Sequence, residues 1–193
     1  MSVVNTLLWE TVAVVVIAPL AGVALAVHGF RALRRAAILF ALMGGVSIFS
    51  AIVIARVPWP TAMAAHLTLG AAAIALAVLG GWCGSTFRDP LDAAASSVTV
   101  ALIATCGLFF LGPTGADLPT PVVNAALLVN PIVAVASAAN IDLLRFEFLY
   151  QISPIAHRRF DYPAWHLAVA CFALVSLMAG AGVARARRLE GLR

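Results

Sequence analysis

The sequence predicts an all-α protein, a polytopic bundle of membrane-spanning helices, from its composition and from the lengths of its apolar runs. Of the 193 residues, 63% are hydrophobic and 10% are charged, and the mean hydropathy is +1.05. Apolar runs of about 18 residues or more are typical of spans, because about 20 helical residues cross a hydrocarbon core. These runs are continuous rather than alternating, which favours helices over a closed barrel.

Five runs have the length and character of a span, and a sixth is interrupted. The sixth, 121–139, is apolar but contains Asn124, Asn130 and Pro131. We therefore expect a single transmembrane domain, 1–193, with five spans plus a re-entrant outer segment at 113–162; six spans are the alternative. The five expected spans lie near residues 7–29, 36–55, 61–82, 95–112 and 163–184.

Arginine positions decide between five and six spans, because arginine clusters are enriched on the cytoplasmic side. The two clusters are Arg31, Arg34 and Arg35 after the first run, and Arg185, Arg187, Arg188 and Arg193 at the end. The two clusters lie on the same side of the membrane only if the run 121–139 does not cross it. We therefore expect the N-terminus and 113–162 outside, and the C-terminus in the cytoplasm.

The residues around 121–139 support a segment that enters the membrane and returns. Pro131 removes a backbone donor and would clash inside a continuous helix. Irregular backbone is tolerated at membrane depth where protein or water surrounds it. The following stretch, 140–165, is expected to emerge into water because it holds six of the 20 formal charges: Asp142, Arg145, Glu147, Arg158, Arg159 and Asp161.

Composition also excludes several functions. All 12 basic residues are arginine, and the net charge of +4 favours contact with anionic lipid over nucleic acid. There is no GxxxxGK[ST] motif, no HExxH motif and no nucleophile with a base nearby, so we expect no enzyme. Abundant alanine and arginine without lysine hint at a GC-rich bacterium, and hence at its inner (plasma) membrane.

Histidines and cysteines do not predict a metal or another cofactor. His28 and His66 are expected on opposite sides of the membrane, too far apart for one haem iron. His157 and His166 both lie near the outer surface, where a bis-histidine site is an alternative to simple hydration. We expect hydrated histidines and three apolar, unpaired cysteines, because the sequence has no CxxC pair: Cys83, Cys106 and Cys171.

Four stretches, taken in order, resemble the membrane subunit of an ABC-2 type ABC transporter. The family's second span, which often carries a proline, resembles 9–27 (WETVAVVVIAPLAGVALAV). Its arginine-bearing cytoplasmic loop resembles 79–100 (LGGWCGSTFRDPLDAAASSVTV). The Asn-Pro element of its outer re-entrant helices resembles 127–144 (LLVNPIVAVASAANIDLL). Its last span and arginine tail resemble 162–188 (YPAWHLAVACFALVSLMAGAGVARARR).

The resemblance implies transport driven by a separate ATPase (nucleotide-binding) subunit, with the membrane subunits forming a homodimer or heterodimer. Two features depart from the family. The chain begins at the equivalent of the second span, and the region where the family has a coupling helix for the ATPase is only FRALRR, 30–35. The alternative is therefore a structural or anchoring subunit that keeps the permease fold without ATPase coupling.

Candidate site residues fall in the outer segment. Asn130 and Pro131 interrupt the sixth run, where amide groups and exposed carbonyls can line a substrate path; alternatively the asparagines, Asn124 included, cap short helices. Asp142 and Arg145 are spaced to pair on a helix, either as an outer gate or as a surface pair. Glu147 is a further candidate on another face of that helix.

Candidate contacts with a cytoplasmic partner fall in the two inner loops. The first loop contributes the arginine cluster Arg31, Arg34 and Arg35, and the second contributes Arg88 and Asp89. The same second loop is also expected to be a solvated turn, with Asp92 as the N-cap of the next helix. Glycines within the spans are expected to allow close helix packing: Gly70, Gly80, Gly81, Gly84, Gly180 and Gly182.

Overall fold

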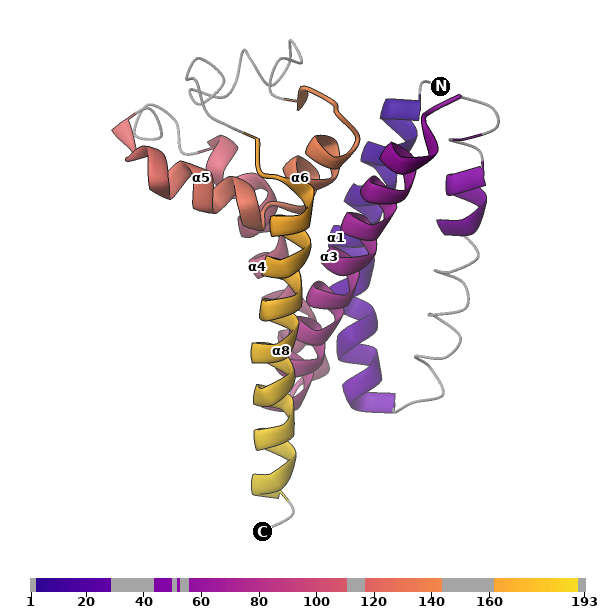
Figure 1. The fold of residues 1–193 in the computed structure, drawn as a ribbon. Helices are drawn as coiled ribbons and strands as arrows, with labels where there is room; N and C mark the ends of the chain where they lie inside the picture. Colours follow the sequence, from indigo (N-terminus) through magenta and orange to yellow (C-terminus); the bar gives the residue numbers. More distant parts are fainter. Residues whose placement is uncertain are drawn as a thin grey trace.

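A computed structural model describes residues 3–28, 44–49, 52, 56–110, 117–143 and 162–190. Within these ranges the ordered elements are helices, so the all-α fold class is confirmed (Figure 1). The named elements are α1 (Val3–His28), α3 (Trp59–Thr86), α4 (Pro90–Cys106), the 3-10 helix η2 (Gly107–Phe110), α5 (Thr120–Val129), α6 (Pro131–Ala138) and α8 (Trp165–Glu190).

Three of the described helices are long and apolar enough to cross a membrane. They cover Thr6–His28, Trp59–Thr86 and Trp165–Arg185, at the positions of the first, third and last of the predicted spans; that they cross a membrane stays a prediction. The predicted span at 95–112 corresponds to α4, which begins at Pro90 and is shorter, followed by η2. The predicted span at 36–55 lies largely outside the described residues.

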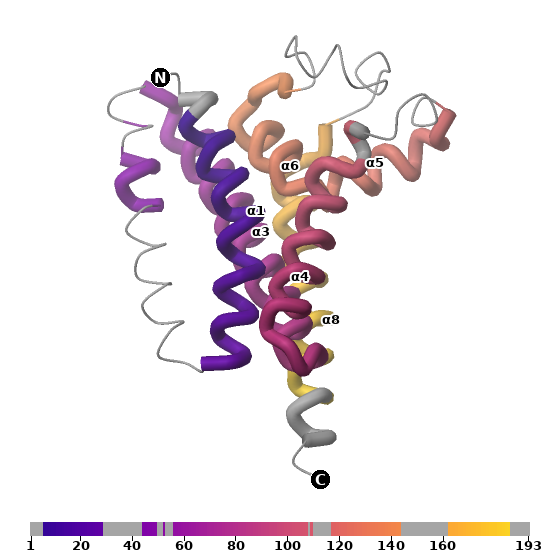
Figure 2. Tube along the Cα trace, turned by 180° about the vertical axis from the view of Figure 1, so that it is seen from behind, coloured from indigo at the N-terminus to yellow at the C-terminus, as the bar shows by residue number. Residues whose placement is uncertain are grey.

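The helices run along the bundle in a simple order. Both α1 and α3 start at the end where the N-terminus lies and run to the opposite end, as Figures 1 and 2 show. From there α4 runs back. The short helices α5 and α6 stay at the N-terminal end, and α8 runs from there to the C-terminus. The end of α4 and the start of α8 therefore lie at the same end of the bundle.

Backbone packs directly on backbone between α1 and α3. A Cβ placed on Gly22 would lie 1.8 Å from the carbonyl oxygen of Ala77, and one on Gly80 would lie 2.0 Å from that of Pro19. Glycine is therefore required at both positions for the helices to approach this closely. The expected role is confirmed for Gly80, whereas Gly70 has no atom within 4 Å of such a Cβ.

Helix α8 joins the bundle along α3 and leaves much of its own apolar surface uncovered. A Cβ on Gly182 would lie 2.8 Å from the indole nitrogen of Trp82, so glycine lets α8 approach that ring. One turn earlier on α8, Leu177 and Met178 are 71% and 68% exposed. Large apolar side chains exposed along a helix of this length are what a lipid-facing surface requires.

The short helix α6 is enclosed by the rest of the protein. Its residues Val133, Ala134, Val135 and Ala136 are all 0% exposed, and α6 packs against α1 and α3. Its end is closed by Asn140, which has a φ of 56°, because asparagine tolerates the left-handed conformation that this kind of helix end needs. Protein therefore surrounds α6 and the irregular backbone at its start, at Asn130, whereas Asn140 at its end is exposed.

Candidate functional site

The break between α5 and α6 is built around a buried asparagine. The two helices meet at Asn130 and are bent by 82°. The Oδ1 atom of Asn130 accepts hydrogen bonds from the backbone N–H groups of Ile132 and Val133, at 3.0 and 3.1 Å. Its Nδ2 atom donates to the carbonyl oxygen of Thr105 at 2.6 Å. The helix break predicted from Pro131 is present, and the hydrogen bond from Asn130 to Thr105 links it to the end of α4.

These bonds favour the capping interpretation of Asn130. The residue is 0% exposed, and its amide is occupied by the first turn of α6 and by α4, so a role for Asn130 and Pro131 in a substrate path stays a prediction. Asn124 lies inside α5 and is exposed. The expectation that Asn124 caps a helix is therefore wrong, because α5 begins four residues earlier, at Thr120.

Of the three residues of the expected outer gate, the structure describes Asp142. The hydroxyl of Tyr162 donates to Oδ1 of Asp142 at 2.6 Å. This bond joins the segment after α6 to the segment before α8, and the hydroxyl of Ser137 donates to the carbonyl oxygen of Pro163 at 2.7 Å beside it. Arg145 and Glu147 lie outside the described residues, so the ion-pair gate stays a prediction.

The turn between α3 and α4 lies at the opposite end of the bundle and exposes Arg88 and Asp89. Oδ1 of Asp89 accepts a hydrogen bond from the backbone N–H of Leu91 at 2.8 Å. The expectation that Asp92 caps α4 is therefore wrong: Pro90 occupies the first helical position, where proline is favoured, so the cap falls on Asp89. Arg31, Arg34 and Arg35 lie outside the described residues.

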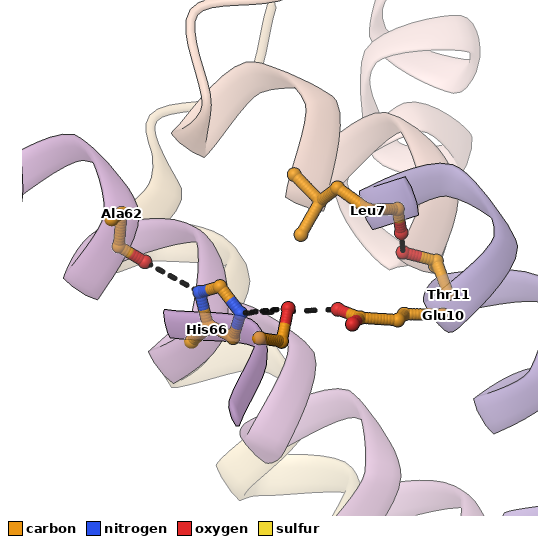
Figure 3. A network of polar contacts seen from close by, with 6 residues as sticks. Leu7, Glu10, Thr11, Ala62 and His66 are labelled. Carbon is orange, nitrogen blue, oxygen red and sulfur yellow. Dashed lines mark hydrogen bonds and ion pairs between the residues drawn. The ribbon is translucent and has the colours of Figure 1, made fainter. Parts of the chain in front are cut away.

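A second polar cluster, which sequence reasoning missed, joins α1, the helical segment 44–49 and α3 (Figure 3). Nε2 of His66 lies 3.0 Å from Oγ of Ser47 and 3.8 Å from Oε2 of Glu10. Nδ1 of His66 lies 2.7 Å from the carbonyl oxygen of Ala62. The His66 side chain is only 8% exposed and that of Glu10 is 25% exposed, so the expected hydration of His66 is wrong.

This cluster lies within the apolar part of the bundle. Glu10 is in the second turn of the Thr6–His28 span, and ionisable residues inside spans usually have a functional role because burying them is costly. A signal for the pairing was present in the sequence. The predicted topology places both Glu10 and His66 near the outer ends of their spans, and thus at the same depth.

The residue types match a serine-histidine-acid triad, but the geometry does not. In such a triad the carboxylate orients the histidine through Nδ1, and the serine faces Nε2. Here Nδ1 faces the carbonyl oxygen of Ala62, and both Ser47 and Glu10 face Nε2. The arrangement therefore suits the holding of a charge or a proton, rather than activation of Ser47 as a nucleophile.

No metal site is apparent in the described part of the chain, where no group of three or more histidine, cysteine or acidic side chains is clustered. Cys83 is buried, and Cys106 and Cys171 are half-buried, all as free thiols. Comparison with protein-family models, with curated proteins and with solved structures found no match for this chain.

Proposed function

We propose that the chain is the membrane subunit of an ABC-2 type transporter, which moves a substrate across a bacterial inner membrane. The observation that carries the proposal is the bent pair α5–α6, which connects α4 to α8 in the chain. The end of α4 and the start of α8 lie at the same end of the bundle (Figure 2), so the bent pair begins and ends on one side. In transporters, broken helices near the membrane interior commonly form the binding site or gate. The order of the four sequence motifs points to the same family.

The charges favour one orientation for such a subunit. The exposed turn with Arg88 and the C-terminal end of α8 lie at the same end of the bundle. Arginine-rich ends favour the cytoplasm, so we place this end inside and the α5–α6 pair outside. In this orientation Asp142, with Arg145 and Glu147, would face the outer surface as a gate.

An ATPase partner would bind at the cytoplasmic end, and any ATP hydrolysis would take place on that partner. The turn that carries Arg88 and Asp89 offers both charges to a partner, together with the first-loop arginines Arg31, Arg34 and Arg35. The membrane subunits would pair as a homodimer or heterodimer. A structural subunit without ATPase coupling is the second candidate, which the short FRALRR loop favours.

Purification of the full-length tagged chain from its native host in mild detergent tests this proposal. We expect an ATPase chain in stoichiometric amount and ATP hydrolysis by the complex. Arg88→Glu should weaken the affinity for the ATPase by about tenfold, because the reversed charge at the interface costs about 1.4 kcal/mol of binding free energy.

The matched control is Arg56→Glu, which changes an exposed arginine just before α3, at the other end of that helix. This variant should retain the partner in full. A stable assembly without any ATPase chain would contradict the transporter proposal and leave the structural subunit. Equal loss of partner in both variants would contradict the placement of the docking surface at Arg88.

A further inference from the structure

One carboxylate oxygen of Glu10 is the starting point for an inference that does not depend on an ATPase partner. Oε2 of Glu10 is buried and has no hydrogen-bond partner among the described residues, and no other buried side-chain oxygen or nitrogen there shares this condition. The buried hydroxyls nearby are all satisfied. Those of Thr11 and Thr68 each donate to the carbonyl oxygen four residues earlier, at 2.8 Å.

A buried carboxylate oxygen without a donor is costly, because the hydration that it loses is not replaced. Nε2 of His66 lies 3.8 Å from Oε2 of Glu10. The other ring nitrogen, Nδ1, faces the carbonyl oxygen of Ala62, and since a carbonyl only accepts, Nδ1 must carry a hydrogen. Nε2 is therefore the ring nitrogen whose protonation decides the charge of the cluster.

We infer that Glu10, Ser47 and His66 form an intramembrane site that binds one proton. With the proton on Nε2, His66 donates to Oγ of Ser47, and its positive charge balances the carboxylate. With the proton on Oε2, Glu10 is neutral, and Ser47 donates to the free Nε2. Without the proton, an anionic Oε2 faces the lone pair of Nε2, and no donor among the described residues replaces the hydration that this oxygen has lost.

The step is reversible proton binding, so no other reactant is needed. The proton comes from water at the N-terminal end of the bundle, which the partly exposed side chain of Glu10 reaches. The N–H bond of His66 or the O–H bond of Glu10 forms as one O–H bond of a hydronium ion breaks, which leaves a water molecule. The proton changes the net charge of the cluster from minus one to zero.

Other ionisable groups in the described helices that pack here are spread between the two ends of the bundle. Segment 44–49 and helix α6 contain none. On α4, Asp92 lies in the first turn, at the far end of the bundle. On α8, Arg185 lies toward the far end, while His166 and the exposed Arg56 lie near the starts of α8 and α3. Among these groups, Glu10 and His66 alone form a charge pair within 4 Å.

The site bridges separate helices, which gives the proton a mechanical consequence. Glu10 is on α1, His66 is on α3, and Ser47 belongs to the helical segment 44–49. Loss of the proton leaves an unbalanced charge on the buried Oε2 between α1 and α3, and separation of these helices would let water reach that oxygen. Protonation therefore favours the closed packing of the two helices at this end.

Nuclear magnetic resonance of the full-length chain in lipid nanodiscs, with labelled histidine and glutamate side chains, tests the inference at neutral pH. The signals of His66 are assigned by their loss in His66→Gln, and those of Glu10 by their loss in Glu10→Gln. A doubly protonated His66, or a neutral His66 beside a protonated Glu10, is the expected result. A neutral His66 beside an ionised Glu10 would overturn the proposal.

The variant Glu10→Gln supplies the second readout. If the two groups share the proton as an ion pair, this variant loses the hydrogen on Nε2 of His66, while Asp89→Asn, which removes an exposed carboxylate, leaves it in place. A His66 that stays doubly protonated in Glu10→Gln would overturn the role of Glu10. The remaining histidine and glutamate signals of each variant report whether it folds, so the loss of one signal assigns its residue where the others are unchanged.

Discussion

At the scale of single residues, glycines decide how closely α1 and α3 pack. Gly22 and Gly80 each lie against a carbonyl oxygen of the other helix, where even a methyl group would overlap it. The overlap is with backbone, so no side-chain rotation can relieve it. Close approach of this kind matters in lipid, where van der Waals packing replaces the hydrophobic effect as the force between helices.

We expect Gly22→Ala to destabilise the bundle by about 1 to 3 kcal/mol, because the added methyl forces α1 and α3 apart. Thermal unfolding of the purified chain in detergent measures the change. The matched control is Gly70→Ala on α3, where the Cβ meets no atom within 4 Å and helix propensity favours alanine. Equal destabilisation by both substitutions would contradict the close backbone contact.

The contact between Glu10 and His66 in the polar cluster was not predicted from the sequence. In the sequence, His66 has no acidic partner nearby, because Glu10 is 56 positions away. Only the packing of α1 on α3 brings the two side chains together. By contrast, a local rule was available for the cap of α4. Proline at the first helical position places the cap one residue before it, which identifies Asp89 rather than Asp92.

At the scale of elements, the α5–α6 break is the feature that the sequence predicted best. Pro131 cannot continue a helix, and Asn130 before it can cap the next one, so both the position of the break and its chemistry follow from two adjacent residues. The bond from Asn130 to the carbonyl oxygen of Thr105 did not follow, because it depends on how α4 ends. The fixed bend thus combines a local signal with a long-range contact.

Asn130→Ala should destabilise the chain by about 2 kcal/mol or more, because it removes the cap of α6 and leaves the buried carbonyl group of Thr105 without that donor. Asn124→Ala is the matched control, since Asn124 is exposed within α5 and its loss should cost less than about 0.5 kcal/mol. Thermal unfolding in detergent compares the two. An equal and small effect would show that the buried amide does not hold the bend.

At the scale of the whole molecule, the fold class and three membrane-length apolar helices followed from apolar runs alone, because run length and lipid thickness are directly related. The direction of each helix is consistent with the predicted topology: α1, α3 and α8 all run the same way, and α4 runs against them. Which end faces the cytoplasm depends on charge statistics rather than on packing, so it needs a direct measurement.

The measurement that tests this arrangement most directly is labelling of single cysteines with an impermeant thiol reagent in intact cells. The three native cysteines are replaced, and Asp117→Cys and Thr86→Cys mark the two ends of the bundle, where both residues are exposed. We predict that Asp117→Cys reacts in intact cells and that Thr86→Cys reacts only after the cells are opened. Reaction of Thr86→Cys in intact cells, with Asp117→Cys protected, would contradict the proposed orientation and the outward-facing gate.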